Sequence, residues 1–124
     1  ADVIVIACPL NASTRNLVNA KFFGHVRDGA IIVNIARGPI VDDAALIDAL
    51  DSGRVGTAIL DVFHTEPLPT NDPLWVHPNV RMTPHTSFAG DGVQDRWDEL
   101  FLDNLPRYVN GEELLNVFDP ADLT

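Results

Sequence analysis

The sequence predicts an α/β fold in which helices flank a parallel sheet and one long helix follows near the C-terminus. Apolar, β-branched runs recur along the chain, helical patterns separate them, and a polar loop rich in Gly or Pro follows most of the runs. Strands that alternate with helices form right-handed crossovers, which build an open parallel sheet with helices on its faces.

Four segments carry the strand pattern. The first runs from Val3 to Cys8, is rich in Val and Ile, and is stopped by Pro9. A continuous apolar run of this kind is typical of a strand covered on both faces. The remaining predicted strands are residues 30–35, 55–62 and 80–83.

Three segments carry a helical pattern. Asn19 can cap a short helix that extends to about residue 26. Asp42 or Asp43 caps a second helix of roughly ten residues, whose apolar positions recur at helical spacing. Residues 90–109 have the amphipathic pattern of a long helix, and Gly111 ends it.

The composition argues against several classes of partner. The chain has 124 residues, with 18 acidic residues against 8 Lys and Arg, so its formal net charge is -10. This charge disfavours a nucleic-acid backbone or an anionic membrane surface as a partner. A single cysteine, Cys8, cannot form an internal disulfide, and these residues contain neither the pattern of a secretory leader nor an apolar run of 18 residues. We therefore expect one domain in the cytoplasm.

The predicted strands bring four loops to one edge of the sheet. Cys8-Pro9, residues 36–38, Asp61-Val62 and Pro84-His85 each lie at or just past the end of a predicted strand. In open parallel sheets, ligands bind outside the carboxyl ends of the strands. We therefore expect the functional residues in these loops.

Three side chains on these loops suit a substrate that carries a carboxylate beside a carbonyl or hydroxyl group. Arg37 offers a planar fork that can hold a carboxylate through two hydrogen bonds. His85 can accept and return a proton near neutral pH, and Glu66 can orient its imidazole and favour the charged form. Taken singly, each also fits a surface ion pair, a solvated carboxylate or a turn residue. Their joint position at one edge favours a functional site.

Three stretches resemble a known family. Residues 33–42, 60–69 and 79–87 look like the three signature segments of the D-isomer-specific 2-hydroxyacid dehydrogenases, in the family's order. The opening strand and its loop, residues 1–15, are also similar to the segment that precedes these signatures. The resemblance implies the second half of a Rossmann-type parallel sheet with flanking helices and a long C-terminal helix.

The resemblance also implies an activity and a role for each residue. A hydride would pass between NAD or NADP and C2 of a D-2-hydroxy acid or 2-keto acid, without a metal. Arg37 would bind the substrate carboxylate and carbonyl, His85 would be the proton donor and acceptor, and Glu66 would pair with His85. The implied cofactor-binding residues are Pro9, Thr14, Ala36, Arg37, Asp61 and His85, with Asp61 at the nicotinamide carboxamide.

The chain is expected to be a fragment, because the Gly-rich phosphate loop of such domains does not occur in it. We interpret residues 1–110 as a partial NAD(P)-binding domain, including a returning helix at about 90–110, and residues 111–124 as a C-terminal tail. The apolar stripe of the returning helix would lack its usual partner. The isolated chain is expected to be inactive and the protein to be a homodimer.

Three other functions compete with this interpretation. Four residues, His64, Glu66, His77 and His85, could hold zinc, although their spacing is not compact. A Ser-His-Asp hydrolase could use Ser87, but the sequence has no G-x-S-x-G turn. A non-catalytic, corepressor-like interaction module of the same fold is the third, and retention of all three candidate catalytic residues argues against it.

Overall fold

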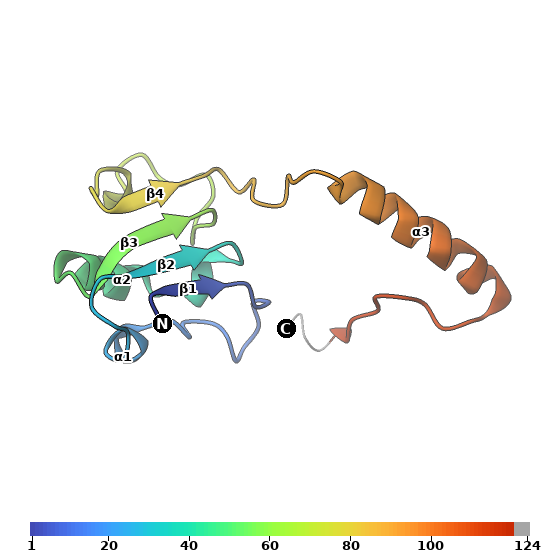
Figure 1. The fold of residues 1–124 in the computed structure, drawn as a ribbon, viewed down its shortest axis with the longest axis horizontal. Helices are drawn as coiled ribbons and strands as arrows, with labels where there is room; N and C mark the ends of the chain where they lie inside the picture. The colour runs from blue at the N-terminus through green and yellow to red at the C-terminus, as the bar shows by residue number, and fades with distance from the viewer. Residues whose placement is uncertain (121–124) are drawn as a thin grey trace.

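The computed structural model describes residues 1–120 and contains the predicted parallel sheet. Its four strands lie in the order β1-β2-β3-β4, and each neighbouring pair is parallel (Figure 1). The strands are β1 (Val3–Ile6), β2 (Ala30–Asn34), β3 (Val55–Leu60) and β4 (Val80–Met82). This arrangement confirms the predicted fold class.

Each strand ends before the apolar run that predicts it. The run that begins at Val3 was expected to continue to Cys8, but β1 ends at Ile6, and β3 ends at Leu60 rather than Val62. The residues after these ends turn into the loops at the carboxyl edge. An apolar run therefore predicts where a strand lies but not where its ladder of hydrogen bonds stops.

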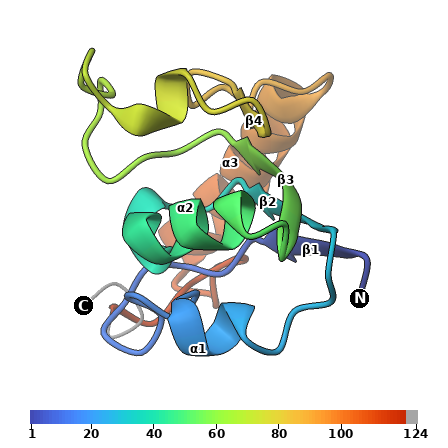
Figure 2. The same cartoon turned by 90° about the vertical axis from the view of Figure 1, so that its left-hand side faces the viewer.

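The two crossover helices are α1 (Ala20–Phe23) and α2 (Asp43–Asp51). The Asn19 side chain caps α1 as predicted, but the helix is shorter than the sequence suggested. The side chain of Asp42, rather than Asp43, caps α2 by accepting a hydrogen bond from a backbone N–H in its first turn. Both helices lie on the same side of the sheet (Figure 2), where α2 packs on β3 and α1 packs on α2.

The hydrophobic core lies between these helices and one face of the sheet. Alternate strand residues point into it, as the buried positions of β2 show. Side chains that are almost fully inaccessible to solvent include Ile32, Ile40, Leu46, Val55 and Leu74.

The opposite face of the sheet is open, which corrects the expectation that the strands are covered on both faces. Val3 and Val5 are 51% and 55% exposed, and Ile59 is 39% exposed. Successive crossovers of one hand, with each new strand added in the same direction, place both helices on the same face. Within residues 1–120, no helix covers the other face.

The long helix α3 (Val93–Asn110) lies apart from the sheet at the end of an extended linker (Figure 1). It begins three residues later than predicted and ends, as predicted, at Gly111, which has a positive φ of 71°. None of its residues is buried. Its exposed apolar side chains are Trp97, Phe101, Leu102, Leu105, Tyr108 and Val109.

The predicted division into a domain of residues 1–110 and a tail of residues 111–124 stays a prediction, and the last four residues of that tail lie outside the described residues. In the part of the chain that the structure describes, no helix has both the length and the apolar character needed to span a bilayer.

Candidate active site at the carboxyl edge of the sheet

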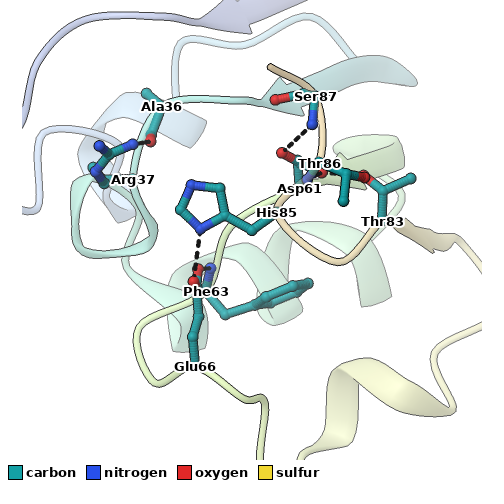
Figure 3. Close-up of polar contacts among 9 residues, drawn as sticks. All are labelled: Ala36, Arg37, Asp61, Phe63, Glu66, Thr83, His85, Thr86 and Ser87. Atoms are coloured by element: carbon teal, nitrogen blue, oxygen red, sulfur yellow. Dashed lines mark hydrogen bonds and ion pairs between the residues drawn. The ribbon is translucent and has the colours of Figure 1, made fainter. Parts of the chain in front are cut away.

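His85 and Glu66 form a hydrogen-bonded pair between two loops at the carboxyl edge (Figure 3). The distance from Nδ1 of His85 to Oε2 of Glu66 is 2.7 Å, and both side chains remain more than one third exposed. The other oxygen of Glu66 accepts a hydrogen bond from the backbone N–H of Phe63 at 2.8 Å. Nε2 of His85 points away from Glu66, into the space beside Ala36 and Arg37. The pair can therefore present Nε2 to a bound molecule.

The surroundings of Glu66 favour its charged form. The hydrogen bond from His85 is the main cause that lowers the pKa of Glu66, and the hydrogen bond from Phe63 N–H lowers it further. Burial raises the pKa of Glu66 by less than either hydrogen bond lowers it, and the charges of His85 and Arg37 lower it slightly further. Arg37 is thus close enough to Glu66 to influence it electrostatically, which brings all three predicted catalytic residues to one region.

Arg37 lies on the loop that follows β2, and Asn34 holds this loop in shape. The amide nitrogen of Asn34 donates to the Arg37 carbonyl at 3.1 Å, and its oxygen accepts from the Ala36 N–H at 3.0 Å. Nη1 of Arg37 donates to the Ala36 carbonyl at 2.7 Å. Asn34 is only 1% exposed. This role of Asn34 was not predicted from the sequence, although a polar residue in an otherwise apolar strand is a signal for it.

Asp61, which follows β3, holds the loop that carries His85. One carboxylate oxygen accepts from the Thr83 hydroxyl at 2.5 Å and from the Thr86 N–H at 2.9 Å, and the other accepts from the Ser87 N–H at 2.9 Å. Asp61 is only 2% exposed. Between these anchor points His85 adopts a positive φ of 55°, which is uncommon for a residue with a side chain. The carboxylate therefore stabilises a backbone conformation that the His85 loop would not readily adopt alone.

Replacement of Asp61 by Asn should destabilise the protein by about 2 to 3 kcal/mol, because the new NH₂ group would face the Ser87 N–H. Burial raises the pKa of Asp61, but hydrogen bonds from Ser87, Thr83 and Thr86 outweigh it and lower the pKa below its ordinary value. The carboxylate therefore stabilises the folded state at neutral pH, and this contribution is lost as pH falls through the lowered pKa.

Urea unfolding at several pH values measures this effect. The difference between the unmodified protein and Asp61→Asn should be largest at neutral pH and should shrink under acid conditions. Asp103, exposed on α3, provides the control, and Asp103→Asn should leave the midpoint unchanged. Equal stability of Asp61→Asn and the unmodified protein at neutral pH would contradict the assignment.

Comparison with known proteins identifies the family. The sequence model of the D-isomer specific 2-hydroxyacid dehydrogenase NAD-binding domain matches residues 1–87. This match covers more than half of the chain. The chain belongs to the D-isomer specific 2-hydroxyacid dehydrogenase family.

Relatives and solved structures agree with this membership. A hydroxypyruvate reductase of Blautia hydrogenotrophica is 39% identical over 90% of this chain and 34% of its own length. A family member from Xanthobacter autotrophicus Py2, solved with NADPH and MES, is 42% identical with a TM-score of 0.89 over 100% of this chain and 50% of that chain. An NADPH-dependent glyoxylate/hydroxypyruvate reductase from Sinorhizobium meliloti, solved with NADP and sulfate, is 30% identical with a TM-score of 0.86, over 99% of this chain and 40% of that chain.

The family's cofactor would contact the loops after β1 and β2, and the groups found there suit its nicotinamide half. The Thr14 hydroxyl donates to the Pro9 carbonyl at 2.7 Å, and the Asn16 N–H donates to the Pro39 carbonyl at 2.9 Å, which joins the two loops. Hydroxyl and carbonyl groups of this kind can form hydrogen bonds with a carboxamide and with ribose hydroxyls. The Gly-rich turn that holds a pyrophosphate does not occur in the sequence. The residues present therefore fit one half of the cofactor.

The predicted cofactor-binding residues differ in how free they are to bind. Pro9 is exposed, whereas Ala36 is 8% exposed and its carbonyl already accepts from Arg37. Asp61 has three of its roughly four acceptor positions occupied by the His85 loop. The Ser87 side chain also hydrogen-bonds to Asp61, so a contact between Asp61 and the carboxamide stays a prediction.

Behind the Glu66–His85 pair lies a cavity of about 570 Å³. Apolar side chains dominate its wall, and Arg37 is not among the residues that line it. The lining consists of Phe63, Glu66, Pro67, Leu68, Trp75, Met82, Thr83, Pro84 and His85. Neither Ala36 nor Arg37, which border the space that Nε2 of His85 faces, lines this cavity.

The geometry gives no support to the two other catalytic alternatives. In residues 1–120, no three His, Cys, Asp or Glu side chains gather closely enough to hold a metal ion. His64 and His77 instead approach Asp43 and Asp51, respectively. Ser87 hydrogen-bonds to Asp61 through its backbone N–H and its side chain, and it does not sit at a strand-to-helix turn.

Proposed function

We propose that this chain forms the catalytic and NAD(P)-binding part of an oxidoreductase that interconverts a D-2-hydroxy acid and a 2-keto acid. The observation that supports this most directly is the 2.7 Å hydrogen bond between His85 Nδ1 and Glu66 Oε2, with Nε2 directed toward the side on which Arg37 lies. A proton-transfer group and a carboxylate-binding group at one crevice are the two features that such a substrate requires.

Each of the three residues has a distinct task in this proposal. Arg37 holds the substrate carboxylate in its fork and stabilises the charge that develops on the neighbouring oxygen. His85 gives a proton from Nε2 to that oxygen in reduction and takes it back in oxidation. Glu66 keeps the imidazole in one orientation through the hydrogen bond to Nδ1. The nicotinamide cofactor, when bound, donates or accepts the hydride at C2.

The chain acts, in this proposal, as part of a longer polypeptide. It covers only 34% of the Blautia hydroxypyruvate reductase, and the pyrophosphate-binding turn does not occur in it. Residues 1–110 form the partial NAD(P)-binding domain, with the helix at about 90–110 returning to another part of the protein. The exposed apolar stripe of α3 supports this, since such a stripe normally packs against a partner.

Turnover by the full-length protein tests the function. Oxidation of NADH or NADPH should be followed with glyoxylate and hydroxypyruvate, the substrates that name two of the relatives. We expect activity from the full-length protein and none from residues 1–124 alone, because the isolated chain lacks the phosphate-binding turn. Robust oxidation by the isolated chain would contradict the assignment of this chain as one part of the site.

The alternative proposal is a non-catalytic interaction module of the same fold. In that case the full-length protein would bind the cofactor but would oxidise it no faster than an Arg37→Ala variant. Loss of turnover in that variant, with cofactor binding retained, favours the enzyme.

We further propose that the protein is a cytoplasmic homodimer that binds neither nucleic acid nor membranes. The net charge of -10 supports the last two points, and the single cysteine is consistent with a reducing compartment. The open apolar face of the sheet and the exposed stripe of α3 provide surface that association could bury. Light scattering on the full-length protein distinguishes a dimer from a monomer.

A further inference from the structure

His64 connects two of the three loops that carry the proposed catalytic residues, namely those of Arg37 and Glu66. Its Nε2 lies 2.7 Å from the carbonyl oxygen of Val41. Val41 ends the loop that begins at Arg37, is only 2% exposed, and pairs with Val18 in an isolated β-bridge. His64 itself lies two residues before Glu66. One hydrogen bond therefore joins the Arg37 loop (residues 36–41) to the Glu66 loop (residues 61–66).

The backbones of the two loops are in direct contact beside this bond. A methyl group at Gly38 would lie 2.0 Å from the carbonyl carbon of Phe63 and 2.3 Å from the nitrogen of His64, closer than Cβ atoms approach other atoms. Only glycine allows the loops to approach so closely. The contact fixes the distance between the loops at this point, and the His64 bond resists sliding of one loop past the other.

The connection continues to the proton-transfer group. The Phe63 N–H donates to Oε1 of Glu66 at 2.8 Å, and Oε2 of Glu66 bonds to His85 at 2.7 Å. A displacement of the segment that contains His64 would move the Phe63 N–H and, with it, the carboxylate. The position of the imidazole relative to Arg37 therefore depends on the bond between His64 and Val41.

The acidic side chains near His64 do not replace this bond. Oδ1 of Asp43 lies 3.9 Å from Nε2 of His64, well beyond the 2.7 Å that separates Nε2 from the Val41 carbonyl. Burial raises the pKa of Asp43, His64 lowers it, and Asp72 and Asp42 raise it further. The hydrogen-bond partner of the His64 ring is thus the Val41 carbonyl. This neutral acceptor requires only an N–H group on Nε2.

We propose that His64 is a positioning residue that sets the placement of the Glu66–His85 pair relative to Arg37. This inference rests on the proposed function for its kinetic consequence. In this proposal His64 contacts neither substrate nor cofactor. It acts on the position of His85 through Phe63 and Glu66. Because Arg37 keeps its own hydrogen bonds to Ala36 and Asn34, loss of the His64 bond should misplace the proton donor and leave carboxylate binding intact.

A pair of substitutions in the full-length protein separates positioning from packing. His64→Leu fills a similar volume but has no donor, whereas His64→Gln can place an N–H near the position of Nε2. We expect kcat to fall on the order of 10- to 100-fold in His64→Leu with little change in the KM of the keto acid. His64→Gln should recover most of kcat. His25→Leu is the control, since Nδ1 of His25 lies 2.7 Å from the carbonyl of Lys21 in α1, away from the site.

Two outcomes would overturn the proposal: unchanged kcat in His64→Leu, or equal losses in the Leu and Gln variants. If His64→Leu does not fold, His64→Asn takes its place. The shorter Asn side chain cannot reach the Val41 carbonyl, so this variant should lose kcat as expected for His64→Leu. If the unmodified protein has no reductase activity, the proposed function fails, and the inference is then decided by hydrogen exchange. The proposal is supported if the Phe63 N–H exchanges faster in His64→Leu than in the unmodified protein, and His64→Gln shows no such increase. Equal exchange rates in the two variants would contradict it.

Discussion

Replacement of His85 by Asn is expected to reduce kcat for 2-keto acid reduction by on the order of 10²- to 10⁴-fold. Asn removes the group that transfers the proton but tolerates the positive φ of 55° at this position better than most residues. Its amide can also donate to Glu66 in place of Nδ1. The loop should therefore keep its shape, and the cofactor dissociation constant should change little. Steady-state kinetics and a cofactor titration of the full-length protein measure the two effects.

His77 provides a matched control for this substitution. It too lies close to a carboxylate, with Nε2 3.3 Å from Asp51, but it precedes β4 and so lies at the opposite edge of the sheet. His77→Asn should leave kcat unchanged. Two results would show that another group supplies the proton. The His85→Asn variant could keep most of its activity, or the His77→Asn variant could lose as much activity as His85→Asn.

Replacement of Arg37 by Ala is expected to lower kcat/KM for the keto acid by on the order of 10²- to 10⁴-fold, since two charge-assisted hydrogen bonds contribute about 1.5 to 3 kcal/mol each. Most of this loss should appear as a higher KM, with a further decrease in kcat from the charge that develops on the substrate oxygen. Arg37→Lys should recover only part of the loss, because an ammonium group keeps the charge but not the planar fork.

Arg81 on β4 is the control for Arg37. Its guanidinium donates to the carbonyl of the preceding residue, Val80, at 2.8 Å, much as Arg37 donates to Ala36 at 2.7 Å. Arg81→Ala should leave kcat/KM unchanged. If Arg37→Ala and Arg81→Ala gave similar small effects, the carboxylate would have to bind at another place.

The sequence was sufficient to predict the elements that local patterns determine. Asn19 and Asp42 cap helices because their side chains reach backbone N–H groups only a few residues away. The loops that carry Arg37 and His85 could be placed because they follow apolar runs ended by Gly or Pro. The pairing of Glu66 with His85 was a hypothesis from chemistry and from the family resemblance, and the structure contains that hydrogen bond.

The sequence was not sufficient where contacts join distant segments. A run such as the one starting at Val3 is the same whether one face or both faces of the strand are covered, so the open face of the sheet could not be foreseen. The three hydrogen bonds from the His85 loop to Asp61 arise only when β3 and β4 pair. The bond from His64 to Val41 likewise depends on the close contact at Gly38.

In the proposed reaction, one substrate bridges the fork of Arg37 and Nε2 of His85. A crystal structure of the full-length protein with NADPH and an unreactive 2-keto acid analogue measures this directly. We expect the carboxylate of the analogue to bind the Arg37 guanidinium and its 2-oxygen to lie within hydrogen-bonding distance of Nε2. An analogue bound instead in the cavity behind the Glu66–His85 pair, without contact to Arg37, would contradict it.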